Sequence, residues 1–92
     1  TENPFDWVAL GDHAYENKNY ELSIKYYKKA AVMAKYLHEP YAGIARSQYM
    51  LGNTKKAHKA MTMAIKNTHK GEVLSIYQAK YELLSNQLNK NK

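Results

Sequence analysis

The sequence lacks cysteine, has few helix-breaking residues and contains no long apolar run. Without cysteine, the chain can form neither disulfides nor cysteine-containing zinc sites. Only two prolines and four glycines occur in 92 residues, a composition that favours helix throughout. No apolar stretch approaches the ~18–20 residues that span a bilayer, and no signal-peptide pattern opens the chain. These features leave a cytoplasmic and a periplasmic location equally open.

Motifs for catalysis and cofactor binding are also missing. The sequence contains no phosphate-binding loop, no dinucleotide fingerprint and no paired catalytic carboxylates. His13, His38, His58 and His69 do not have the spacing of a metal-ligand pair. Ser23 stands at a packing position of the repeat described below, so we do not expect it to be a nucleophile. We therefore expect no enzymatic activity, no cofactor and no metal.

Proline, glycine and asparagine divide the chain into five expected helices. Pro4 and Pro40 each lie near the start of an apolar-periodic stretch, where the missing N–H costs nothing. Asn3 is a suitable N-cap, and Gly52 can adopt the left-handed conformation that ends a helix. The expected helices cover about 4–17, 20–36, 39–51, 54–68 and 72–88. The short connections within the first two pairs predict antiparallel hairpins.

An internal repeat relates the two hairpins. A shift of 34 residues aligns the first with the second without a gap. Large residues then coincide with large ones and small with small: Trp7 with Tyr41, Leu10 with Ile44, Gly11 with Ala45, Tyr15 with Tyr49, and Ala30 with Ala64. Such a pattern indicates a packing requirement, because small residues let helices approach and large ones fill the remaining gaps.

This pattern resembles the tetratricopeptide repeat (TPR) family, whose repeats are helical hairpins of 34 residues. The residues that match in type and spacing are Trp7, Leu10, Gly11, Ser23, Tyr27, Ala30, Ala45, Gly52, Ala57 and Ala64. The sequence departs from the family at Ala14, where an aromatic residue is expected, and at Lys35 and His69, where a proline would close each repeat. The resemblance covers about residues 4–71. It implies an all-α, TPR-type helical hairpin solenoid with repeats at about 4–37 and 38–71.

The fifth expected helix, about 72–88, follows the repeat pattern poorly. Polar or small residues occupy the packing positions of the repeat: Ser75, Gln78, Ala79 and Glu82. An apolar stripe nevertheless runs along another face, formed by Val73, Ile76, Tyr77, Tyr81, Leu84 and Leu88. We expect a capping helix that covers the second repeat. The alternative is the first half of a third repeat. Since the chain starts with Thr1 rather than Met, we expect it to be part of a larger protein.

The resemblance implies a protein–protein interaction module without catalytic function. In TPR stacks, the first helix of each hairpin lines a concave face that binds a peptide or protein segment. The residues that this relation assigns to the groove are Asp12, Tyr15, Glu16, Arg46, Tyr49, Met50 and Lys80. Helical spacing supports the assignment independently, because these positions point away from a packing face formed by Trp7, Leu10, Gly11 and Ala14.

Two reservations about the groove remain open at this stage. Tyr15 and Tyr49 can equally be packing residues, and the charged side chains can simply be solvated. The carboxylate clamp of chaperone-associated TPR proteins is not expected here. Asp12 and Gly43 stand where that clamp has asparagine, and an aspartate would repel a ligand carboxylate.

The net charge of +6 is concentrated on the second helix of each hairpin and its flanks. The lysines concerned are Lys25, Lys28, Lys29, Lys35, Lys55, Lys56, Lys59, Lys66 and Lys70. This face is either simply solvated or a surface for nucleic acid or an anionic partner. Nucleic acid is the disfavoured partner, because the chain has a single arginine and no recognised nucleic-acid motif. A further alternative is a homo-oligomer formed through the apolar stripe of the terminal helix.

Overall fold

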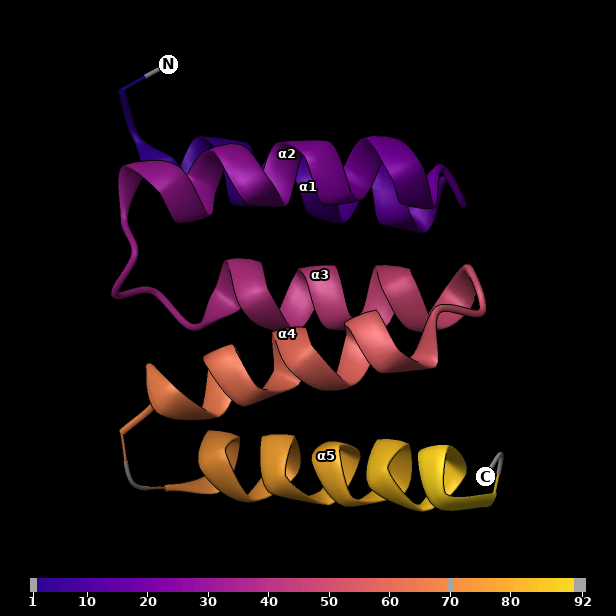
Figure 1. Ribbon diagram of the computed structural model, residues 1–92. Coiled ribbons are helices and arrows are strands. Elements are labelled where there is room, and N and C mark those ends of the chain that lie inside the picture. Colours follow the sequence, from indigo (N-terminus) through magenta and orange to yellow (C-terminus); the bar gives the residue numbers. More distant parts are fainter. Residues whose placement is uncertain (1, 70, 91–92) are drawn as a thin grey trace.

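The chain folds into five α-helices that follow one another through the stack (Figure 1). The computed structural model describes residues 2–69 and 71–90. The helices are α1 (Pro4–Glu16), α2 (Tyr20–Met33), α3 (Glu39–Met50), α4 (Thr54–Lys66) and α5 (Glu72–Lys90). Helices α1 and α2 form one hairpin, α3 and α4 form the second, and α5 packs against α4. The expected all-α architecture of two hairpins and a terminal helix is confirmed.

Local sequence explains where the helices begin and end. The side chain of Asn3 accepts a hydrogen bond from the N–H two residues on at 2.9 Å, and Asn19 caps α2 similarly at 3.3 Å. Gly52 has φ +83° after α3, as expected for a residue that ends a helix. Lys18, which is 34 residues earlier, has φ +61° in the equivalent turn of the first hairpin. The two tight turns are therefore alike.

Helix α2 ends at Met33, before the expected end at residue 36. Ala34 leaves the helical conformation with φ −142° and ψ 82°, and its side chain stays buried. The chain then turns, and the N–H of Leu37 donates to the carbonyl of Ala34 at 3.2 Å. Helix α4 likewise ends at Lys66 rather than at residue 68. The turns between the hairpins are thus longer than the sequence predicts.

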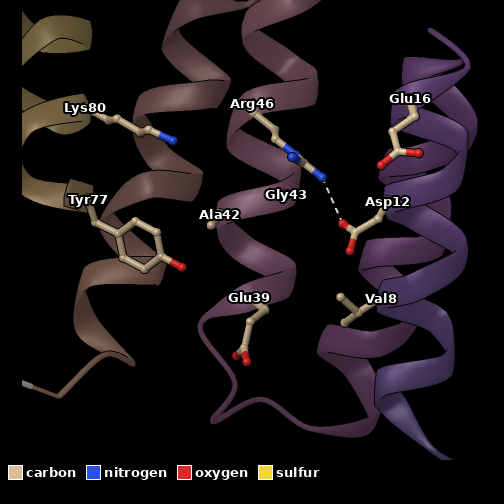
Figure 2. Close-up of a pocket in the computed structure, with 9 residues that line it drawn as sticks. All are labelled: Val8, Asp12, Glu16, Glu39, Ala42, Gly43, Arg46, Tyr77 and Lys80. Carbon is tan, nitrogen blue, oxygen red and sulfur yellow. Dashed lines mark hydrogen bonds and ion pairs between the residues drawn. The ribbon is translucent and has the colours of Figure 1, made fainter. Parts of the chain in front are cut away.

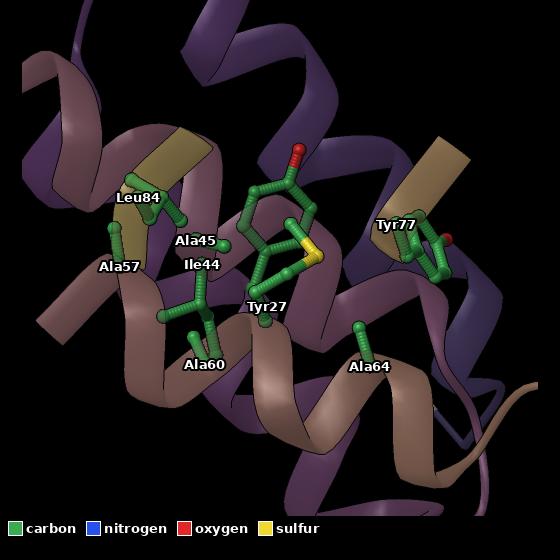
Figure 3. Packing of buried hydrophobic residues seen from close by; sticks show 9 residues of the cluster. Tyr27, Ile44, Ala45, Ala57, Ala60, Ala64, Tyr77 and Leu84 are labelled. Atoms are coloured by element: carbon green, nitrogen blue, oxygen red, sulfur yellow. The ribbon is translucent and has the colours of Figure 1, made fainter. Parts of the chain in front are cut away.

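The core consists of small side chains around a few large ones. The cluster comprises Tyr27, Ile44, Ala45, Ala57, Ala60, Met61, Ala64, Tyr77 and Leu84 (Figure 3). Its alanines allow α3 and α4 to approach closely, so the large side chains can fill the space that remains. Ser23 and Ser47 are also wholly buried, and their hydroxyls lie 2.7 Å apart. Ser23 is therefore a packing residue, as predicted.

Two glycines make room for the ring of Tyr27, which has no exposed surface. A Cβ atom at Gly11 would lie 2.6 Å from a ring carbon, and one at Gly43 would lie 2.5 Å from the ring. Since carbon atoms do not approach this closely without displacement, α1 and α3 accept the ring only where each lacks a side chain. Tyr27 thereby sets the positions of three helices. Leu10, expected on the same packing face as Gly11, is instead 42% exposed, because no described helix covers that side of α1.

Helix α5 closes the described stack with its apolar stripe turned toward α4. Tyr77 and Leu84 are buried, and the ring of Tyr81 stacks on His58 with 4.3 Å between centroids. The side chain of His58 also lies 2.9 Å from the hydroxyl of Ser85. The residues at the repeat's packing positions are all exposed, namely Ser75, Gln78, Ala79 and Glu82. Helix α5 therefore presents a polar face outward.

Replacing Gly43 with Ala should lower the free energy of unfolding by about 1–3 kcal/mol, because the added methyl group overpacks the Tyr27 ring. Helix propensity alone would give a gain of up to about 1 kcal/mol, so the sign distinguishes the two effects. Urea unfolding measures the difference. Gln78→Ala, at an exposed position of α5, is the control and should change stability by less than about 0.5 kcal/mol. An unchanged or higher unfolding midpoint for Gly43→Ala would contradict this packing.

Candidate functional site

Helices α1, α3 and α5 line a groove formed by two adjoining pockets. The first, which we call the polar pocket, has a volume of about 350 Å³. Its lining residues are Val8, Asp12, Glu16, Glu39, Ala42, Gly43, Arg46, Tyr77 and Lys80 (Figure 2). The groove is thus built mainly from the first helix of each hairpin and from the terminal helix.

The second pocket, which we call the apolar pocket, has a volume of about 360 Å³. It is lined by Ala45, Arg46, Tyr49, Met61, Lys80, Leu83, Leu84 and Gln87. Arg46 and Lys80 belong to both pockets, so these two cations mark the place where the pockets meet. The groove therefore has a polar half and an apolar half.

A hydrogen-bonded ion pair links α1 to α3 in the polar half. Arg46 Nη2 donates to Asp12 Oδ1 at 2.8 Å and to Tyr27 Oη at 2.7 Å. The Tyr27 hydroxyl donates to the same Asp12 oxygen at 2.5 Å. The side chains of Arg46 and Asp12 are 41% and 49% exposed, so the ion pair alone contributes at most about 1 kcal/mol. Its main effect is to neutralise Asp12 and to hold Arg46 at the centre of the groove.

Tyr15 supports Arg46 from the other side. The guanidinium carbon lies 4.0 Å from the centroid of the Tyr15 ring, a cation–π contact. Tyr15 in turn packs edge-on against Tyr20, with 5.4 Å between centroids. Tyr15 thus acts on the groove through Arg46.

Burial raises the pKa of the Tyr27 hydroxyl to about 12; the hydrogen bond to Asp12 acts in the same direction, and Arg46 opposes it. Burial would lower the pKa of Arg46, but its bond to Tyr27 and the charge of Asp12 outweigh burial and raise it. The pKa of Tyr77 is also raised, first by burial and then by the nearby Glu39 carboxylate. Near neutral pH the two tyrosines are therefore uncharged and Arg46 is a cation.

The structure brings most of the predicted site residues together. Those that line the pockets are Asp12, Glu16, Arg46, Tyr49 and Lys80. Tyr49 is 47% exposed, and its hydroxyl accepts a hydrogen bond from Gln87 at 3.4 Å. Tyr15 lies against Arg46, as described above, and Met50 is exposed at the end of α3 but lines neither pocket. The charged groups and Tyr49 thus form the groove, with Tyr15 as a supporting residue.

Several groove residues escaped the sequence analysis. Glu39 lines the polar pocket, and its Oε1 atom is buried without a hydrogen bond, 3.4 Å from the His38 ring. The other ring nitrogen of His38 lies 2.7 Å from the Tyr77 hydroxyl, which also lines this pocket. In the apolar pocket, the residues that were not predicted are Leu83, Leu84 and Gln87.

The repeat contained a signal for the ion pair. Asp12 and Arg46 are 34 residues apart, and Lys80 follows after the same interval. Equivalent positions of successive repeats lie side by side in a stack. Opposite charges at one repeat position therefore indicate an ion pair across the inner face.

The apolar stripe of α5 is not the self-association surface that the sequence suggested. Tyr77 and Leu84 are buried inside the chain, and Tyr81 packs on His58. Val73, Ile76 and Leu83 remain exposed. The lysines predicted on the outer face are exposed along α2, α4 and the turn after α2; Lys70 lies outside the described residues.

No family model matches this chain, and no curated protein or solved structure matches it. Within residues 2–69 and 71–90, no cluster of three or more histidine or acidic side chains could hold a metal ion. No helix in this part of the chain is long and apolar enough to cross a membrane. The inference of function therefore starts from the groove.

Replacing Tyr27 with Phe should destabilise the protein by about 1–3 kcal/mol near neutral pH, because Asp12 and Arg46 lose a shared partner. The loss should also depend on pH. The folded-state pKa of Tyr27 is about 12, above the ordinary value of 10.0, so the stability due to its neutral form is complete below pH 10. This contribution is lost as the pH rises through 10 toward 12.

Urea unfolding of both proteins between about pH 7 and pH 11 tests this expectation. The stability gap between the native chain and Tyr27→Phe should narrow above about pH 10, where the unfolded tyrosine ionises first. The remaining tyrosines and the lysines are common to both proteins, so their titration cancels in the difference. A gap that stays constant with pH would show that Tyr27 does not have this environment.

Proposed function

We propose that this chain is a non-catalytic, TPR-type protein-interaction module. It binds a peptide or protein segment in the groove of α1, α3 and α5, and it forms part of a larger protein. The observation that carries this proposal is the groove itself, in which the two pockets adjoin at Arg46 and Lys80. A groove with polar and apolar halves suits a segment of chain that presents several side chains in succession.

Groups that are available to a ligand lie along this groove. Among the described residues, Glu16 and Lys80 have neither a hydrogen-bond nor an ion-pair partner. Tyr49 and Leu83 expose large apolar surfaces at 47% and 63%. Asp12 and Arg46, in contrast, already satisfy one another. The groove therefore combines a rigid, internally neutralised centre with available charges and apolar side chains around it.

Three observations support the TPR assignment. The 34-residue phasing of the sequence coincides with two helical hairpins. Small residues stand at the helix contacts, and Tyr27 fills the space between them. The first helix of each hairpin lines the groove, as the family resemblance implies. The proposed repeats cover about 4–37 and 38–71, with α5 as the cap.

The outer face supports a second candidate, binding to an anionic surface. Trp7, Lys28, Lys29, Val32 and Met33 line a shallow depression on the first hairpin. Val32 is 75% exposed, and the Lys29 amine lies 4.6 Å from the Trp7 ring centroid. Apolar side chains beside lysines suit an anionic partner. Binding at this depression would be independent of the groove.

A double charge reversal in the groove, Glu16→Lys with Lys80→Glu, separates these candidates without changing the net charge. Capture of the partner by the intact parent protein should fall at least about tenfold, because both available charges then repel the groups that they now attract. Crosslinking with mass spectrometry identifies and quantifies the captured partner. The matched control is Glu21→Lys with Lys25→Glu on α2, where both positions are exposed, and it should leave capture within about twofold.

Circular dichroism should show that both variants remain helical. Undiminished capture by the groove variant would contradict binding in the groove. A loss that is confined to the α2 variant, or to Lys28→Glu, would instead favour the outer face.

A further inference from the structure

The apolar pocket has the form of an anchor site for one large side chain. Met61 and Leu84, which are only 3% and 6% exposed, form its buried floor. Tyr49 and Leu83 stand at its mouth and expose about half or more of their surface. Its volume of about 360 Å³ is near the lower end of ligand pockets, which run from roughly 300 to 1,000 Å³. A side chain fits this space, whereas a whole helix does not.

Charge at the inner end of this pocket selects what can accompany the anchor. Lys80 reaches from α5 in the direction of α3, beside Arg46 (Figure 2). Lys80 has no ionic partner among the described residues, whereas the charge of Arg46 is offset by Asp12. An acidic side chain next to the anchor would pair with Lys80, and a basic one would be repelled. The net charge of +6 also attracts an acidic ligand.

The carboxylates of the polar pocket set the limit of the acidic stretch. Glu16 and Glu39 lie on the far side of Lys80, and Glu16 has no partner among the described residues. A ligand that carried acidic residues along its whole length would meet these carboxylates and be repelled. The groove therefore favours a segment in which acidic charge is confined to the neighbourhood of the apolar anchor.

We propose that the preferred ligand is a protein segment with a large apolar side chain in the apolar pocket and an adjacent acidic side chain paired with Lys80. This inference rests on the proposed function, because it specifies the chemistry of the segment that the groove takes. It names Leu83 and Lys80 as the residues that determine specificity. Neither touches Tyr27 in the core, so both can be substituted while the hairpins stay folded.

Selection from a random peptide library displayed on phage, with the full chain as bait, tests the proposal. Enriched peptides should contain Leu, Met, Phe or Trp next to Asp or Glu. A synthetic peptide of the enriched sequence should bind Leu83→Glu at least about tenfold more weakly, because a charge then stands at the pocket mouth. Lys80→Glu should reverse the preference, so that the same peptide with Lys in place of the acidic residue binds better.

Val32→Glu is the matched control, since Val32 is an equally aliphatic residue that is 75% exposed on α2. It should leave peptide affinity within about twofold. Leu83→Ser, which removes the side chain without adding charge, should also weaken binding and guards against a purely electrostatic effect. Circular dichroism and urea unfolding of each variant exclude loss of fold.

The outcomes separate this inference from the proposed function. Enriched peptides without the apolar–acidic pair, or peptides that bind Leu83→Glu normally, would overturn the inference. If such peptides still lose binding to the Glu16→Lys, Lys80→Glu variant, the groove remains the binding site and only its assigned chemistry is wrong. Peptides that ignore both sets of substitutions, or no enrichment at all, would contradict the inference and the proposed function together.

Discussion

The ring of Tyr27 extends from α2 into the space between α1 and α3, where Gly11 and Gly43 have no side chain to oppose it. Most of the remaining architecture depends on this contact. The ring sets how closely the three helices approach, and its hydroxyl reaches the groove at the point where Asp12 and Arg46 meet. One side chain thus couples the core to the inner face. A change in the packing of Tyr27 would also displace the charged centre of the groove.

Neutralisation at this centre determines which groups remain for a ligand. Asp12 and Arg46 satisfy one another and Tyr27, and Tyr15 supports the guanidinium from the other side. The charges left over are those of Glu16, Glu39 and Lys80, arranged on the two sides of the pair. Because the centre is already bonded, a ligand does not have to break it in order to bind. Such preorganisation lowers the cost of association.

Much of the fold was predictable from short-range signals. Pro4, Pro40 and Gly52 mark helix boundaries, and the 34-residue interval reveals the paired hairpins. The charged groove residues followed from helical spacing and from the family resemblance. Their mutual contacts were harder to predict, because a hydrogen bond between Tyr27 and Asp12 depends on how two helices are packed, which spacing along one helix does not determine.

The terminal helix explains most of the errors. Its sequence departs from the repeat, so Leu83, Leu84 and Gln87 could not be assigned to the groove by equivalence with α1 and α3. Tyr77 belonged to an apolar stripe that was available either to α4 or to another molecule, and the sequence alone could not decide between them. The ends of α2 and α4 were misplaced for a related reason. Without the proline that closes a repeat, no local residue marks where those helices stop.

Binding in the groove is the central claim, and NMR mapping of amide chemical shifts tests it most directly. The measurement uses the isotope-labelled chain titrated with a segment recovered from its partner or by peptide selection. The account predicts that the largest changes occur at Glu16, Arg46, Lys80 and Leu83, on the inner sides of α1, α3 and α5. Changes confined to Lys25, Lys28 and Lys59 on α2 and α4 would contradict it.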